Sequence, residues 1–130
     1  MIVVDTNVIA YACLENPLRP AALKLAQTDP HWRAPALWRS EMRNLLAGYL
    51  RKGRMNVEQA AAVFTEADWR MGTRLDLPNS AAVLRLVMTC RCTAYDLEFV
   101  ALAQQLAVPL VTMDRELLAT FPDVARPLPG

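Results

Sequence analysis

The chain has 130 residues, of which 54% are hydrophobic and 21% are charged, and its formal net charge is +1. This size and composition predict a single globular domain over residues 1–130 and exclude disordered, coiled-coil and collagen-like chains. The longest unbroken apolar runs are only a few residues, against the ~18 that a membrane-spanning helix needs, and no signal-peptide pattern opens the sequence. We therefore expect a cytoplasmic protein that makes no membrane contact.

The first half of the chain predicts two short strands and three helices. The strands are expected at Met1–Val4 and His31–Ala34, and the helices at Ala21–Gln27, Pro35–Lys52 and Val57–Met71. The first strand is apolar and β-branched, and it stops at the polar Asp5, where we expect a loop. The two long helices show apolar residues at helical spacing and are linked only by the short segment Gly53–Asn56. They should therefore pack as an antiparallel pair.

The second half repeats the alternation of strands and helices. Strands are expected at Thr73–Leu77 and Pro109–Met113, helices at Ser80–Cys90, Ala94–Leu106 and Arg115–Thr120, and a loose tail or edge strand at Pro122–Gly130. Strands that alternate with helices predict an α/β fold, in which helices cover both faces of a mostly parallel sheet.

Two acidic residues follow apolar strands. Asp5 comes directly after the first strand, and Asp114 comes directly after the strand that ends at Met113. The carboxyl ends of parallel strands meet at one edge of a sheet, and open α/β folds bind their ligands there. The two acids should therefore be neighbours if their strands are adjacent.

Two further acids lie on helix faces that are otherwise apolar. Glu41 comes three residues after Trp38 and four before Leu45, and Asp96 comes three residues before Phe99. At 3.6 residues per turn, both acids fall within the stripe that should face the core. A lone buried carboxylate costs several kcal/mol, so such an acid needs a positive partner, a shared proton or a metal ion.

Each acid also has an ordinary structural explanation when it is taken singly. Asp5 and Asp114 can cap a turn or a helix, Asp96 can interact with a helix dipole, and Glu41 can pair with a neighbouring arginine. We consider four such coincidences less plausible than one shared acidic site. Carboxylates without histidine or cysteine suit Mg²⁺ or Mn²⁺, and two such ions can clamp a phosphodiester. Glu98 is about 200° around its helix from Asp96 and is expected in solvent.

Four segments carry a resemblance to a known family. They are VVDTNVI (Val3–Ile9), WRSEMRN (Trp38–Asn44), TAYDLEFVALAQQL (Thr93–Leu106) and PLVTMDREL (Pro109–Leu117). In order and spacing the sequence resembles the PIN-domain family, and within it the VapC-like toxin ribonucleases of bacterial toxin-antitoxin pairs. The resemblance implies a three-layer α/β/α sandwich and a divalent-metal site that cleaves single-stranded RNA.

The family's acids fall on the four residues already selected. The resemblance therefore implies that Asp5, Glu41, Asp96 and Asp114 bind metal and are catalytic. It also implies that Asn7 and Thr112 support the site by holding a water or a carboxylate.

Other side chains are candidates for contacts with RNA. The arginines nearest in sequence to the site are Arg39, Arg43, Arg91 and Arg115, which could rim it with phosphate contacts. Trp38 and Tyr95 could stack on bases, although their helical spacing favours packing in the core.

The apolar fraction is high for so short a chain, so some apolar surface should be exposed. The best candidates lie on the two long helices and are Leu46, Tyr49, Leu50, Val63 and Trp69. We expect a homodimer, together with a groove that receives a segment of an antitoxin protein.

Two other functions stay open at this point. An aspartate-dependent phosphatase could use Asp5 as a nucleophile, but it would need a second acid where Asn7 stands and a strand-end lysine. A catalytically silent RNA-binding or protein-binding module would be expected to lack one of the four acids.

Overall fold

The computed structural model describes residues 1–130 and contains four strands and seven helices. In chain order these are β1 (Ile2–Val4), α1 (Thr6–Cys13), α2 (Arg19–Thr28), β2 (Trp32–Arg33), α3 (Trp38–Arg51), α4 (Val57–Met71), α5 (Ser80–Val87), α6 (Ala94–Leu106), β3 (Leu110–Val111), α7 (Arg115–Thr120) and β4 (Ala125–Arg126). All neighbouring strands pair in parallel, in the order β2-β1-β3-β4. The strands β1 and β3 therefore occupy the centre of the sheet.

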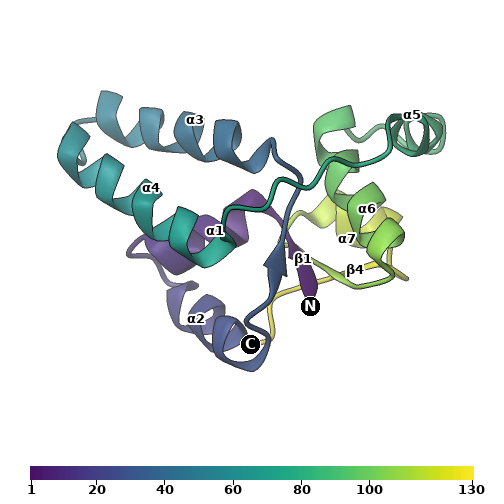
Figure 1. Ribbon diagram of the computed structural model, residues 1–130, viewed down its shortest axis with the longest axis horizontal. Helices are drawn as coiled ribbons and strands as arrows, with labels where there is room; N and C mark the ends of the chain where they lie inside the picture. The colour runs from purple at the N-terminus through teal and green to yellow at the C-terminus, as the bar shows by residue number, and fades with distance from the viewer.

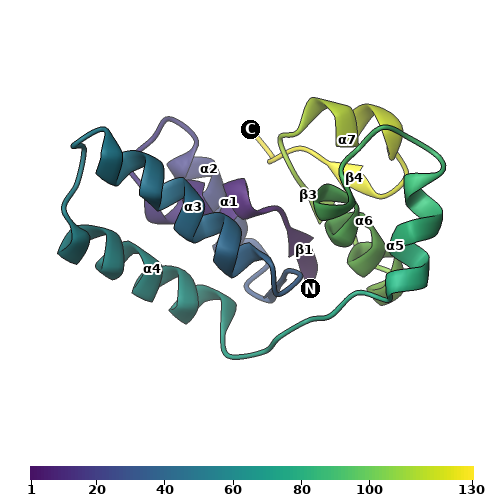
Figure 2. The ribbon, with the colours of Figure 1, turned by 90° about the horizontal axis from the view of Figure 1, so that it is seen from above.

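Helices cover both faces of the sheet. Helices α1 to α4 gather on one side and α5 to α7 on the other (Figure 1), and the view from above shows the same two groups on either side of β1 (Figure 2). Helix α6 packs on β1 and β3, whereas α1 packs against α2, α3 and α4. The predicted three-layer α/β/α sandwich with a parallel sheet is confirmed, as is the antiparallel pairing of α3 with α4.

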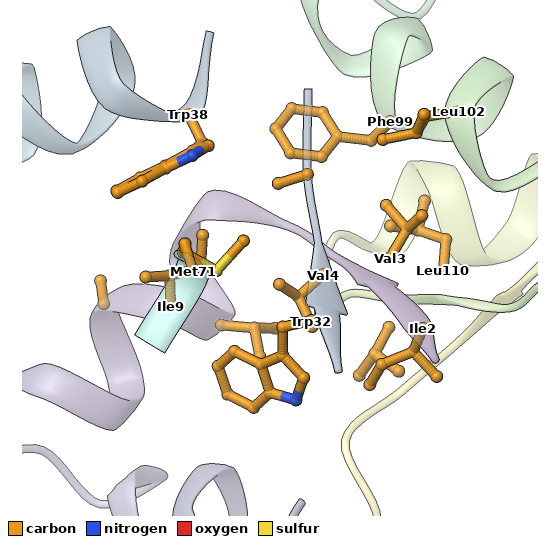
Figure 3. Close-up of a cluster of buried hydrophobic side chains, with 14 of the residues drawn as sticks. Ile2, Val3, Val4, Ile9, Trp32, Trp38, Met71, Phe99, Leu102 and Leu110 are labelled. Atoms are coloured by element: carbon orange, nitrogen blue, oxygen red, sulfur yellow. The ribbon is translucent and has the colours of Figure 1, made fainter. Parts of the chain in front are cut away.

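The central strand is apolar on both faces, as a sheet covered on two sides requires. Val3 and Val4 are both fully buried. Successive side chains of a strand point to opposite faces. Figure 3 accordingly shows Val3 beside Leu110, and Val4 on the side of Ile9 and Met71.

Helix α1 corrects the prediction of a loop after Asp5. The helix begins at Thr6, with Asp5 as its N-cap. Six of its eight residues are buried, and the helix is too short for its two other residues, Asn7 and Tyr11, to mark a clear helical period. The consequence for the site is that Asp5 lies at a direct junction between a strand and a helix.

The predicted strand at 73–77 does not join the sheet. Only an isolated parallel bridge forms there, between Pro35 and Asp76. Both carboxylate oxygens of Asp76 also accept from the Arg33 guanidinium, at 2.8 and 2.5 Å, which fastens this crossover segment to β2. At the other end of the sheet, the C-terminal segment forms the parallel edge strand β4, which was one of its two predicted states.

The exposed apolar surface lies elsewhere than predicted. Of the five predicted residues on the two long helices, Leu46 is buried, Tyr49, Leu50 and Val63 are half-buried against the core, and only Trp69 is exposed. A larger group is exposed on α5 and directly before and after it. This group, called the α5 patch below, consists of Leu77, Leu84, Val87 and Met88. None of the seven helices is long and apolar enough to cross a membrane.

Candidate active site

The predicted acids meet at the carboxyl edge of the sheet. Asp5 directly follows β1, and Asp114 lies three positions after the end of β3. These two strands are paired neighbours, so the acids are brought to the same edge, as the strand pattern predicted. Both line one cavity of about 640 Å³, which is also lined by Glu41 of α3 and Asp96 of α6. The structure therefore gathers all four acids around one cavity, from separate parts of the chain.

Two hydrogen bonds hold the carboxylate of Asp5. Its Oδ1 accepts from the backbone N–H of Asn7 at 2.9 Å, and its Oδ2 accepts from the hydroxyl of Thr112 at 2.6 Å. The Thr112 hydroxyl also accepts from the backbone N–H of Asp114 at 3.0 Å. One buried threonine thus fixes two of the acids relative to each other. Asn7 is exposed and lines the cavity beside them.

Glu41 is held by a residue that sequence reasoning missed. Its Oε1 accepts from the hydroxyl of Thr6 at 2.7 Å. Thr6 is the first residue of α1 and is buried, so this bond also ties α1 to α3. The signal in the sequence was a polar residue that opens an otherwise largely apolar segment.

The other two acids lie at helix N-termini. Thr93 is the N-cap of α6, and its hydroxyl accepts from the backbone N–H of Asp96 at 3.1 Å. Asp114 is itself the N-cap of α7, because its Oδ1 accepts from the backbone N–H of Leu117 at 3.0 Å. The capping explanation is therefore correct for both Asp5 and Asp114. It is compatible with a second role, because a carboxylate offers about four lone-pair sites.

Missing cationic partners distinguish the site acids from four of the five other half-buried acids, the fifth being Glu98. Four half-buried acids outside the site have an ion pair, and these are Asp29, Glu66, Asp68 and Asp76. None of the four site acids has a lysine, arginine or histidine nitrogen within 4.0 Å. The site thus concentrates negative charge that the protein itself does not neutralise.

Burial raises the pKa of Asp5, of Glu41 and of Asp96. In each case a nearby threonine hydroxyl opposes the rise, from Thr112 for Asp5, Thr6 for Glu41 and Thr93 for Asp96. The charges of other site acids add to it: Asp114 raises the pKa of Asp5 and of Asp96, and Asp5 raises that of Glu41. The acids therefore repel one another, and a bound cation would relieve this repulsion.

The polar groups that line the cavity are of the kind that binds a hard divalent cation. The cavity is lined by carboxylate, amide and hydroxyl groups, and no histidine or cysteine is among its lining residues. Oxygen ligands of this kind suit Mg²⁺ and Mn²⁺. No three of the acids are close enough together to form a metal-binding group as they stand. The fit therefore rests on the donor chemistry and on the missing cationic partners.

The arginines expected at the rim divide into two pairs. Arg39 and Arg43 lie on the other side of α3 from Glu41, with their guanidinium carbons 5.1 and 5.5 Å from the centre of the Phe64 ring. Arg39 also pairs with Asp68 of α4, so these two arginines face α4 and not the cavity. The other two, Arg91 and Arg115, are exposed and have no ion pair, but neither lines the cavity.

Two further expectations need correction. Tyr95 is 66% exposed and lines the cavity, so it does not pack in the core, whereas Trp38 is buried and stacks on Phe64 as expected. Glu98 is half-buried and not solvated, and burial raises its pKa. It lines a separate groove with Leu77 and Leu84, because the segment before α5 covers the face of α6 that the helical pattern predicted to be open.

The fold agrees with what comparison with known proteins gives. The model of the PIN domain matches residues 2–126, and the chain belongs to the PIN domain family. It is 27% identical to Ribonuclease VapC3 of Pyrobaculum aerophilum, in an alignment that covers 97% of this chain and 98% of that protein. The crystal structure of FitAcB from Neisseria gonorrhoeae superimposes with a TM-score of 0.72 at 19% identity, and the match covers 96% of this chain and 95% of that one. The predicted resemblance to the family is confirmed.

Proposed function

We propose that the protein is a divalent-metal-dependent endoribonuclease that cleaves single-stranded RNA. One observation carries the proposal: four half-buried carboxylates line a single cavity, and none has a cationic partner. Membership of the PIN domain family supports it, and so does the similarity to a protein named as a ribonuclease. An RNA substrate also favours a cytoplasmic location. The phosphatase alternative has no support, because no lysine lines the cavity to neutralise a phosphoryl group.

Asp5, Glu41, Asp96 and Asp114 would hold Mg²⁺ or Mn²⁺. Such a cation, when bound, supplies a water that is acidic enough to attack at neutral pH and offsets the charge that develops on the phosphate. The protein contributes orientation: Thr112 fixes Asp5 relative to Asp114, and Thr6 fixes Glu41.

A protein nucleophile has no activating partner here. His31 is the only histidine of the chain and lies in a different pocket, beside Trp69. The serine in the cavity, Ser40, therefore has no imidazole to take its proton. We propose instead that water attacks phosphorus and that the bond to O3′ breaks, which leaves 5′-phosphate and 3′-hydroxyl ends.

The test uses the purified protein with a 5′-labelled and a 3′-labelled single-stranded RNA. Cleavage is expected with Mg²⁺ or Mn²⁺ and should stop in excess EDTA. The ends of the products are identified by their sensitivity to phosphatase and by mass spectrometry. Undiminished cleavage in EDTA, or products with 2′,3′-cyclic phosphates, would falsify this mechanism.

We propose two protein partners as well. The first is a second copy of the chain, bound through the α5 patch, which is an apolar surface that monomers seldom leave open to water. The second is an antitoxin protein, whose basic side chain would pair with the unpartnered carboxylates and compete with the metal for them. A gene beside this one that encodes a small DNA-binding protein would support the second partner. Co-expression of that protein should then block cleavage.

A further inference from the structure

The cavity must hold RNA without basic side chains. Thirteen residues line it, including the four acids, and none is a lysine, arginine or histidine. Pairs between arginine or lysine and phosphate, which dominate most nucleic-acid interfaces, are therefore missing from its walls. Apart from the proposed metal contacts, binding here has to come from stacking and from neutral hydrogen bonds.

Tyr95 is the side chain placed to supply stacking. It lies in the first turn of α6, next to Asp96, and it is 66% exposed although it lines the cavity. The backbone of this turn is fixed by the N-cap Thr93, so the ring projects from a rigid base. The other aromatic residue of the cavity, Phe99, is only 3% exposed and belongs to the core.

The opposite wall offers neutral polar groups. Ser40 and Asn44 of α3 are exposed, line the cavity and make no side-chain hydrogen bond within the protein. A hydroxyl and an amide of this kind can donate to and accept from the edge of an unpaired base. The cavity therefore presents an aromatic side chain on α6 and free hydrogen-bonding groups on α3, and the four carboxylates line the same cavity.

We propose that Tyr95 determines specificity by stacking on an unpaired base next to the phosphate that is cleaved, while Ser40 and Asn44 face the edge of that base. This inference rests on the proposed function. It gives a physical reason for single-stranded RNA as the substrate class, because in a duplex both faces of an interior base are covered by its neighbours.

The test compares Tyr95→Ala and Tyr95→Phe on an intact RNA and on RNAs that carry one abasic nucleotide at each position around the cleavage site. Tyr95→Ala should raise KM about 5- to 150-fold on intact RNA, the range expected for one stacked base. Tyr95→Phe should stay near wild type, because stacking does not need the hydroxyl. Trp69→Ala is the matched control, since Trp69 is 78% exposed but lies outside the cavity.

The decisive result is non-additivity. At one abasic position the wild type should lose at least as much as Tyr95→Ala loses on intact RNA, because the contacts of the base edge are lost as well, and adding Tyr95→Ala on that abasic RNA should cost nothing further. If the losses add at every position, or if Tyr95→Ala is silent, the stacking role is overturned. Fluorescence anisotropy with the same RNAs separates this result from failure of the proposed function. If the wild type binds RNA but does not cleave it, the proposed nuclease function is wrong, and the binding of the abasic RNAs still decides the stacking role of Tyr95. If the wild type binds no RNA, both the proposed function and the stacking role are overturned.

Discussion

The hydroxyl of Thr112 donates a 2.6 Å hydrogen bond to Asp5. It also accepts a 3.0 Å bond from the backbone of Asp114, so one side chain joins the ends of the two central strands to the candidate site. Thr112 is fully buried, so no water can replace it if the hydroxyl is removed.

Thr112→Val should therefore damage both stability and cleavage. It keeps the shape of the side chain but leaves a buried carboxylate oxygen without its donor, which costs about 1–3 kcal/mol. Denaturant unfolding measures the loss, and Thr112→Ser is the control that restores the hydroxyl. A valine variant as stable and as active as the wild type would show that the hydrogen bond does not position Asp5.

Neutralising a repelled acid should abolish cleavage and stabilise the metal-free protein. At neutral pH, Asp5→Asn, Asp96→Asn and Glu41→Gln should each raise Tm by a few degrees in EDTA. Burial raises the folded-state pKa of these acids above 3.8 for Asp and 4.5 for Glu. A raised pKa means that folding favours the protonated acid. Its contribution to stability is therefore fully present when the pH is below the ordinary pKa, and it is lost as the pH rises through the raised pKa. The advantage of the variants should accordingly disappear when the pH falls to about 3.8.

Glu98→Gln is the matched control for that series. Glu98 is also half-buried with a raised pKa, but it lies outside the cavity. The glutamine variant should gain stability at neutral pH and still cleave RNA. Lower Tm values for all of the site variants would mean that the acids are held by attractive contacts, which contradicts the unpartnered cluster.

Two substitutions of Asp114 should separate its role as a helix cap from its role in cleavage. Asparagine caps a helix about as well as aspartate, and losing the charge relieves the repulsion of Asp114 on Asp5 and Asp96, so Asp114→Asn should be inactive with a Tm in EDTA no lower than that of the wild type. Asp114→Ala should be inactive and should also lose about 0.5–2 kcal/mol, because the N–H of Leu117 loses its acceptor. Cleavage assays and thermal melts of the two variants decide this. Activity in Asp114→Asn would remove Asp114 from the catalytic set.

Adding a divalent cation should stabilise the wild type. A ligand that binds only the folded state raises stability by RT ln(1 + [L]/Kd), so Tm should climb steadily with Mn²⁺ concentration. EDTA should reverse the rise, and Asp5→Asn should show a much smaller one. Equal shifts in the wild type and in Asp5→Asn would place the bound metal outside the cavity.

The α5 patch should control the oligomeric state. Leu84→Asp puts a charge in the patch and should yield a folded monomer of 14.5 kDa in light scattering. Trp69→Asp should leave the dimer intact, since Trp69 lies outside the patch. Leu46→Asp should fail to fold, because Leu46 is only 4% exposed. A wild type that stays at 14.5 kDa up to high micromolar concentration would rule out the dimer.

The sequence predicted the elements whose pattern is local. The bounds of α4, α6 and α7 agree with the prediction, because a capping residue precedes each of them, namely Asn56, Thr93 and Asp114. Helix α1 was missed because it has only eight residues and follows β1 with only Asp5 between them, so the polar residues Asp5, Thr6 and Asn7 resemble a loop. The four acids could be selected because each interrupts an apolar pattern.

Interactions between distant segments were beyond prediction. The hydrogen bond from Thr6 to Glu41, 35 positions away, could not be predicted without knowing that α1 packs on α3. The surroundings of Glu98 depend on where the segment before α5 crosses α6, and those of Arg39 depend on which side of α3 is covered by α4. Helical period alone places a side chain on a face, but tertiary packing decides whether that face is open.

The order of the strands has a consequence for synthesis of the protein. The central strand β1 is made first, yet its neighbour β3 and the residues that complete the cavity come after residue 109. Closing so long a stretch of chain is entropically costly and comes late in folding. A nascent chain, or a fragment cut between α6 and β3, therefore lacks both Thr112 and Asp114 and has no assembled site. The four acids can come together only after synthesis has passed Asp114, so any activity of the site would begin no earlier than that point.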